Sequence, residues 1–306
     1  ARGTNVTLIL KAPAGFQFNT AVTPSVTYIA GRDFTSASAA MTDSSAITVT
    51  LIVTGTAARD TLTIGSTTGI QVQPIGGSPL ASGNITVATN STETVSGITK
   101  GNTSLGALTE VGGTVVQLAF TRQPAGATAG AVFSTQPVLK SEDQFGNPST
   151  NGLLATSYIA LALNSGTGPL QGTTSTNLGM SGAKGFVTFT NLRIDVAGAD
   201  YQLSATSTNN LGTTLSSIFT VNPAAASKLI VATQPSPTAT VGVAFSQQPV
   251  IYIKDAYDNF RSSDTLTVTA TRSEGAGTLL GATNVMAVGG VVTYTNLAHP
   301  YATNIT

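Results

Sequence analysis

Short runs in which apolar and polar residues alternate cover most of this chain, and they predict β-strands. The clearest run is 5–11, which ends at a Pro-Ala-Gly turn. Further strands are expected at 25–29, 46–53, 61–64, 70–72, 84–88, 115–121, 131–133, 137–142, 158–163, 185–192, 201–206 and 217–221. Short strands separated by turns at this spacing are typical of a β-sandwich or barrel, so we expect an all-β fold.

The chain also repeats itself at the scale of a whole domain. Gln123-Pro124, Phe133-Ser134, Gln136-Pro137-Val138 and Asp143 recur as Gln234-Pro235, Phe245-Ser246, Gln248-Pro249-Val250 and Asp255. The run 185–192 recurs as 290–297. A period of about 110 residues is too long for a solenoid and matches one small domain. Repeat position and alternation place Phe133, Phe186, Phe189 and Phe245 in the core.

Three tandem Ig-like β-sandwich domains are predicted: residues 1–113, of a different subtype, and the repeats 114–222 and 223–306. We expect the third to be incomplete at its C-terminus, because nine residues follow Leu297 whereas 29 lead from Leu192 to Val221. Two explanations stay open. Either the chain is a piece of a longer protein, or a neighbouring subunit supplies the missing strand by β-strand addition.

Charged residues make up only 8% of the chain, with 13 basic and 13 acidic residues among its 306. This balance leaves no electrostatic signature of binding to nucleic acid, and no apolar run is long enough for insertion into a membrane. Cysteine is absent, which excludes disulfides and thiolate metal sites. We expect no cofactor and no enzymatic activity. The only histidine, His299, precedes Pro300 and is expected in a loop rather than in a catalytic triad.

Four acidic residues are the candidates for a metal site. Glu142 and Asp143 precede one expected turn, and Asp255 and Asp258 lie in its repeat counterpart. Aspartates in turns accept hydrogen bonds from backbone N–H groups two residues on, and we expect that role here. The alternative is a calcium site, although no stretch matches an EF-hand loop.

Asn5, Asn84, Asn90, Asn102 and Asn304 each begin an Asn-x-Ser/Thr triplet, the acceptor sequence for N-glycosylation. In a chain so rich in serine and threonine, about this many triplets arise by chance. The triplets are therefore candidates by motif only.

Several motifs mark a resemblance to a known family. They are Gln136-Pro137-Val138 leading to Asp143-Gln144-Phe145-Gly146-Asn147, then Gly198-Ala199-Asp200-Tyr201-Gln202-Leu203, and the terminal Phe219-Thr220-Val221. Through them, residues 115–306 resemble the bacterial Ig-like repeats of invasin- and intimin-type surface proteins and of giant adhesins. In the last repeat the turn reads Asp255-Ala256-Tyr257-Asp258-Asn259 and loses its glycine. The resemblance implies export, location at the cell surface, and adhesion or matrix building.

These observations predict a structural extracellular protein: a stalk, or the repeating subunit of a filament, with copies of itself or adjoining domains as partners. The alternative is a carbohydrate- or protein-binding adhesin module, or accessory domains of a larger secreted enzyme. In that alternative the partner is a surface glycan or protein.

Overall fold

The computed structural model describes residues 3–29, 33–55, 60–180 and 184–301, and every regular element in these ranges is a β-strand. The predicted all-β fold is confirmed. The chain divides into two compact units, Ala1–Val116 with Glu142–Gly152, and Gln117–Ser141 with Leu153–Thr306. We refer below to the first region (3–113), the middle region (114–222) and the last region (223–301). The division into three domains stays a prediction.

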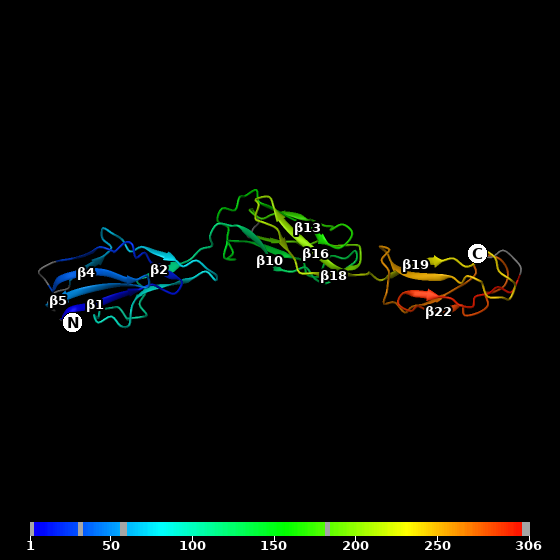
Figure 1. Ribbon diagram of the computed structural model, residues 1–306, viewed down its shortest axis with the longest axis horizontal. Helices are drawn as coiled ribbons and strands as arrows, with labels where there is room; N and C mark the ends of the chain where they lie inside the picture. The colour runs from blue at the N-terminus through cyan, green and yellow to red at the C-terminus, as the bar shows by residue number, and fades with distance from the viewer. Residues whose placement is uncertain (1–2, 30–32, 56–59, 181–183, 302–306) are drawn as a thin grey trace. The chain divides into compact units, whose positions relative to one another are not determined.

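The first region is built on a five-stranded antiparallel sheet with β1 (Gly3–Lys11) at its centre (Figure 1). Its order is β4-β5-β1-β8-β9, with β4 at Phe34–Asp43, β5 at Ala46–Val53, β8 at Ser82–Val87 and β9 at Gly106–Thr109. Alternate residues of β1 and β5 form the core, as the two-residue period of a strand requires. Two strand pairs complete the region: β2 (Phe16–Phe18) with β7 (Val72–Pro74), and β3 (Val26–Tyr28) with β6 (Leu62–Ile64).

The middle region contains two sheets. One has the order β10-β12-β15, with β10 at Gln117–Arg122, β12 at Val138–Glu142 and β15 at Phe186–Thr188. The other has the order β11-β18-β16-β13-β14, with β17 beside β16. Its strands are β11 (Ala127–Thr128), β13 (Tyr158–Ser165), β14 (Ser175–Asn177), β16 (Gly198–Ser207), β17 (Thr214–Leu215) and β18 (Phe219–Asn222). Both sheets contribute fully buried side chains, among them Leu139, Ile159 and Tyr201.

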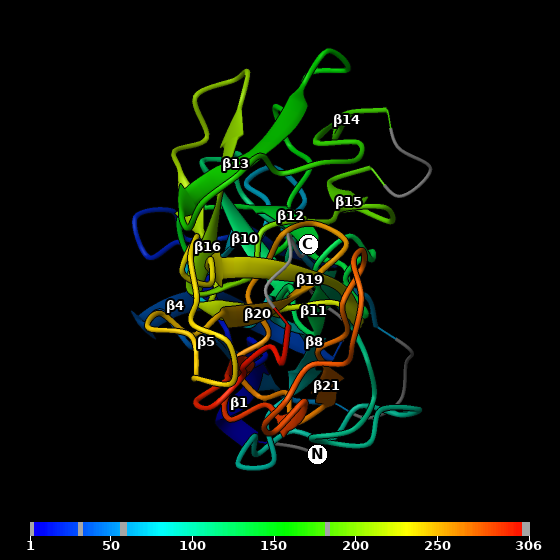
Figure 2. The same ribbon diagram turned by 90° about the vertical axis from the view of Figure 1, so that its right-hand side faces the viewer.

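The last region reproduces part of this arrangement. β19 (Ala226–Thr233), β20 (Val250–Asp255) and β23 (Val291–Thr293) form one antiparallel sheet, in which β19 and β20 lie side by side (Figure 2). β21 (Thr267–Thr269) and β22 (Asn284–Met286) form a second, two-stranded sheet. Ile253 and Val292 from the first sheet and Val268 from the second share one buried cluster.

Repeated residues make the same hydrogen bonds in both regions, which explains why they recur. The side-chain amide of Gln136 donates to the carbonyls of Phe133 (3.2 Å) and Leu192 (3.0 Å), and its oxygen accepts from Leu192 N–H (3.1 Å). Gln248 makes the three equivalent bonds with Phe245 (3.0 Å) and Leu297 (3.1 and 3.0 Å). The glutamine therefore links two loops that are far apart in sequence, a long-range contact that apolar periodicity does not reveal.

Some sequence-based predictions of local structure are wrong. Residues 131–133 form no strand; Val132 makes only an isolated bridge with Arg193. Phe133, Phe189 and Phe245 are buried as predicted, but Phe186 is 39% exposed, because β15 turns its alternate residue Val187 inward instead. Strand β4 was not predicted, since its run of Ser and Ala has no marked alternation of hydrophobicity.

Candidate functional site

Two five-residue turns, which we call the aspartate turns, lie 112 positions apart at 143–147 and 255–259. Each turn is closed by a backbone hydrogen bond: Asp143 N–H donates to the Asn147 carbonyl (3.0 Å), and Asp255 N–H to the Asn259 carbonyl (3.0 Å). The first turn lies in the first compact unit and the second turn in the second. The first turn begins directly after β12, and the second begins at Asp255, the last residue of the corresponding strand β20.

The aspartate carboxylate at the start of each turn is buried and accepts four hydrogen bonds. Asp143 accepts from Phe145 N (2.9 Å), Asn147 N (3.0 Å), Asn147 Nδ2 (3.2 Å) and Gly113 N (2.9 Å). Asp255 accepts from Tyr257 N (2.8 Å), Asn259 N (2.9 Å), Asn259 Nδ2 (2.8 Å) and Ala224 N (2.9 Å). The bond from the N–H two residues on is the one predicted from sequence. The fourth bond is the informative one, because its donors lie where the repeats begin: Gly113 immediately precedes the middle region, and Ala224 is the second residue of the last region.

The asparagine at the end of each turn extends this contact to a second preceding segment. Asn147 Nδ2 donates to the Gly77 carbonyl (2.7 Å). Asn259 Nδ2 donates to the Asp195 carbonyl (2.8 Å), and its side-chain oxygen accepts from Ala197 N–H (2.8 Å). Aspartate and asparagine together therefore hold two separate segments upstream of the turn.

The aromatic residue inside each turn makes a third equivalent contact. A Cβ added to Gly76 would lie 2.8 Å from the ring of Phe145, and one added to Gly130 would lie 2.0 Å from the ring of Tyr257. Each ring thus lies directly against a glycine of a preceding segment, where a larger side chain would displace it.

The loss of glycine from the second turn does not change its geometry. Gly146 has a φ of 83°, and Asp258, at the same position in the repeat, has a φ of 68°. Aspartate is among the residues that tolerate this left-handed conformation best. Asp258 also forms an exposed ion pair with Lys228, at 2.9 Å between Nζ and Oδ1.

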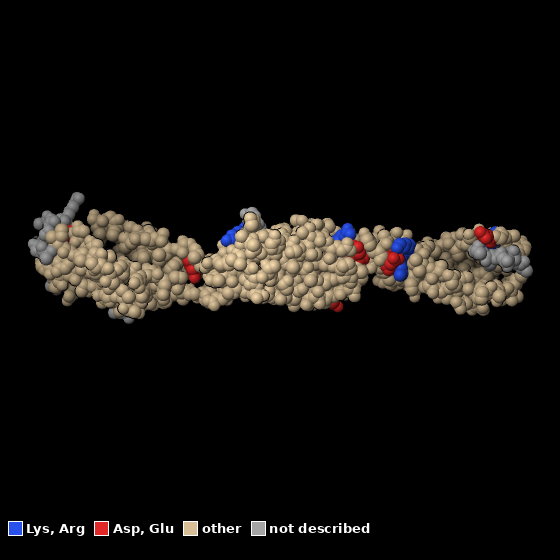
Figure 3. Space-filling model, turned by 90° about the horizontal axis from the view of Figure 1, so that it is seen from above, with Lys and Arg blue, Asp and Glu red and all other residues tan. Residues whose placement is uncertain are grey.

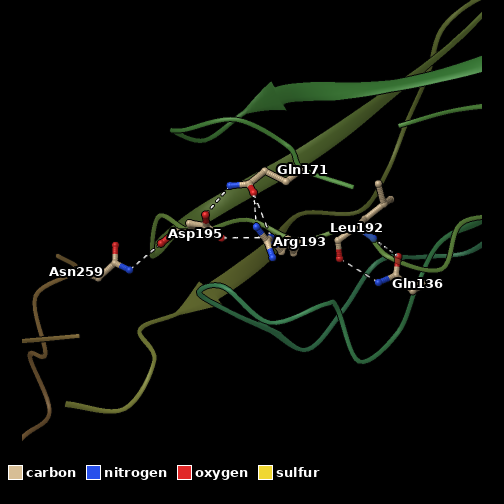
Figure 4. A network of polar contacts seen from close by, with 6 residues as sticks. All are labelled: Gln136, Gln171, Leu192, Arg193, Asp195 and Asn259. Atoms are coloured by element: carbon tan, nitrogen blue, oxygen red, sulfur yellow. Dashed lines mark hydrogen bonds and ion pairs between the residues drawn. The ribbon is translucent and has the colours of Figure 1, made fainter. Parts of the chain in front are cut away.

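A polar network orients the loop that the second turn binds (Figure 4). Gln171 Nε2 donates to Asp195 Oδ2 (2.5 Å), and Arg193 Nη2 donates to Gln171 Oε1 (2.7 Å). Arg193 also lies 3.6 Å from Asp195 Oδ1. On the side of the turn, Arg261 donates to the Ala224 carbonyl (2.6 Å) and pairs with Asp264. Both sides of the contact are held in place by their own side chains.

Two of the four candidate metal ligands, Asp143 and Asp255, use their carboxylates to form these turns. The oxygens of Asp143 and Asp255 accept N–H hydrogen bonds, Glu142 is buried, and Asp258 is paired with Lys228. Across 3–29, 33–55, 60–180 and 184–301, no three metal-ligating side chains come together. The same ranges contain no helix long and apolar enough to span a membrane.

His299 lies in a loop, as predicted, but it is buried. Its Nδ1 is 2.8 Å from the Tyr301 carbonyl and its Nε2 is 3.0 Å from the Ala276 carbonyl. Of the triplet asparagines, Asn5, Asn84, Asn90 and Asn102 are exposed, and Asn304 lies outside the described residues.

Folding lowers the pKa of both Asp143 and Asp255. Burial raises the pKa of each, but the hydrogen bonds to the carboxylate oppose burial and together outweigh it. A carboxyl whose folded pKa lies below its unfolded value of about 3.8 adds stability that is fully present above that value. This stability is lost as the pH falls through the folded pKa.

We therefore expect a melting temperature that is level between about pH 7 and pH 5 and falls below about pH 4. Calorimetry across this range measures it. The Asp143→Asn/Asp255→Asn double variant should have a lower melting temperature at pH 7, and that temperature should fall less as the pH is lowered. If the melting temperatures of the two proteins fell equally with pH, these two carboxylates would not be the cause of the acid dependence.

No protein family model and no curated protein matches this sequence. The geometry of the two aspartate turns indicates attachment rather than catalysis or metal binding. The buried carboxylates accept hydrogen bonds from backbone N–H groups, and the asparagine and aromatic side chains beside them contact segments that precede the turn. Sequence reasoning missed the asparagine and the aromatic residue of each turn as contact residues. The 112-residue spacing of the whole Asp-x-aromatic-x-Asn pattern was the signal that could have identified them.

Proposed function

We propose that this chain is a structural part of a bacterial extracellular surface protein. In it, tandem Ig-like β-sandwich domains form a stalk or the repeating subunit of a filament that serves adhesion or matrix formation. The observation that carries the proposal is the duplication of the aspartate turn together with all three of its contacts. A protein whose function is spacing needs each repeat attached to the segment before it in the same way.

The composition of the surface supports the same proposal. Few Lys, Arg, Asp and Glu side chains are visible on the face drawn in Figure 3, in keeping with 8% charged residues in the whole chain. Little like-charge repulsion opposes side-by-side packing of such surfaces. A filament or matrix protein benefits from that property.

Immunogold labelling of intact cells that make the protein tests the location. We expect label on the cell surface or on extracellular fibres, whereas label confined to the cell interior would overturn the proposal. If saturable glycan binding accompanied a surface label without fibres, the adhesin-module alternative would replace the filament.

Single-molecule stretching tests the mechanical role. Each repeat should unfold as a separate event that releases about 35–40 nm, the length of about 110 extended residues. The Asp143→Asn and Asp255→Asn variants should lower the force of the events. A single irregular event, or unfolding forces that the variants leave unchanged, would contradict a mechanical role for the aspartate turns.

A further inference from the structure

Asn151 is the only asparagine of the chain that is followed by a glycine. Both residues are exposed, and neither the side-chain amide of Asn151 nor the N–H of Gly152 makes a hydrogen bond to another described residue. Gly152 has a φ of 77°, a left-handed conformation that glycine adopts freely because it has no Cβ. An unbonded amide therefore lies one residue before an unhindered backbone nitrogen.

The backbone of Asn151 pairs with the segment where the middle region begins. Its carbonyl accepts from Val115 N–H (3.0 Å), and its N–H donates to Ser149 Oγ (3.2 Å). Ser149 Oγ donates in turn to the Gly113 carbonyl (2.5 Å), and Gly113 N–H donates to Asp143 Oδ2 (2.9 Å). Three hydrogen bonds thus connect the backbone of Asn151 to the buried carboxylate of the first aspartate turn.

The second repeat lacks this pair of residues. At the equivalent positions, 112 residues further on, the chain has Ser263 and Asp264. Serine has no amide group that could leave as ammonia. Asp264 pairs with Arg261, which donates to the Ala224 carbonyl (2.6 Å). Chemistry that needs an asparagine before a glycine is therefore confined to the first turn.

We propose that Asn151 is a site of spontaneous modification that loosens the first aspartate turn with age. The Gly152 nitrogen bonds to the side-chain carbonyl carbon of Asn151, and the side-chain NH₂ leaves as ammonia with the proton of that nitrogen. Water then opens the resulting five-membered succinimide ring. Opening at the side-chain carbonyl gives aspartate in a normal main chain. Opening at the backbone carbonyl gives isoaspartate, whose main chain is longer by a methylene group.

The two products have different effects on the turn. The longer main chain of isoaspartate shifts the backbone groups that pair with Val115 and Ser149, so the bond from Gly113 to Asp143 loosens. The aspartate product keeps the original main chain and with it these hydrogen bonds. This inference goes beyond the proposed function and does not depend on it, because the reaction requires only the local geometry.

Peptide mapping by mass spectrometry, after incubation of the full chain in warm, mildly alkaline buffer, tests the modification. Replacement of NH₂ by OH should be at least about tenfold faster at Asn151 than at Asn164, which precedes a serine and donates its amide to Gln202 (2.7 Å). Synthetic aspartyl and isoaspartyl peptides identify the two products by their retention. Asn151→Ser, which introduces the residue of the second repeat, is the matched control and should yield no modified peptide at this position.

Native-state hydrogen exchange tests the effect on the turn. In the isoaspartyl fraction, separated by ion exchange, the amide of Gly113 should exchange at least about tenfold faster than in the fresh chain. The amide of Ala224, at the second turn, should keep its rate and so report that the protein is otherwise intact. Asn151→Asp has the charge of the product without the longer main chain, and we expect it to match the fresh chain at both amides.

Modification at Asn151 that is no faster than at Asn164 would overturn the proposal. So would an unchanged exchange rate of Gly113 in chains that contain isoaspartate. An effect of Asn151→Asp as large as that of ageing would also overturn it, because the charge rather than the longer main chain would then loosen the turn. Surface labelling and stretching of fresh chains do not depend on these outcomes.

Discussion

Replacing Asp255 by asparagine is expected to lower the free energy of local opening around the second aspartate turn by about 2–4 kcal/mol. The change replaces the charged acceptor of four hydrogen bonds by a neutral amide. One of the two acceptor oxygens becomes an NH₂ group, which then faces N–H donors. A buried donor left without an acceptor costs more than the bond itself contributed. Native-state hydrogen exchange at the amides of Ala224, Tyr257 and Asn259 measures the effect where it arises.

Asp258→Asn is the matched control for this prediction, with the same chemical change three residues away. Asp258 is exposed and makes an exposed ion pair, so its loss should cost less than about 1 kcal/mol. Asp143→Asn should reproduce the Asp255→Asn effect at the amide of Gly113, because the two turns make equivalent bonds. Equal effects of Asp255→Asn and Asp258→Asn would show that the buried carboxylate does not hold the preceding segment.

Replacing Tyr201 by alanine is expected to destabilise the middle region by about 3–5 kcal/mol. Tyr201 is fully buried, and its ring lies against Phe219 with centroids 6.0 Å apart. Its hydroxyl lies 2.8 Å from the Val196 carbonyl and 2.9 Å from the Thr167 carbonyl. Truncation removes the packing and the hydrogen bonding together.

Tyr201→Phe separates these two contributions and should cost only about 1–2 kcal/mol, the penalty for leaving buried carbonyls without a donor. The control is the same substitution at an exposed tyrosine, Tyr158→Ala on neighbouring β13. Because Tyr158 is 45% exposed, this substitution should change the free energy of unfolding by less than about 1 kcal/mol. Urea-induced unfolding measures all three variants. If Tyr201→Phe proved as costly as Tyr201→Ala, the hydroxyl rather than the ring would dominate at this position.

Local patterns in the sequence predicted most of the first region and the turns. The expected strand at 46–53 coincides with β5, and the expected run at 5–11 lies within β1. The hydrogen bonds from Phe145 and Tyr257 to their aspartates were predictable because donor and acceptor are two residues apart. The exposure of Phe186 was not predictable, since both faces of that run are apolar and only strand pairing decides which face turns inward.

The linear pattern of residues was enough to predict an all-β fold, a repeat of about 110 residues and aspartates that form matching turns. These features depend on periodicity and on contacts between near neighbours, which side-chain chemistry specifies directly. The distant contacts could be read only from the folded chain: Asp143 and Asp255 bind the backbone N–H groups of Gly113 and Ala224 at the starts of their repeats, and Asn147 and Asn259 reach Gly77 and Asp195. Those contacts join segments tens of residues apart, so they depend on strand order and register, which the linear pattern does not encode.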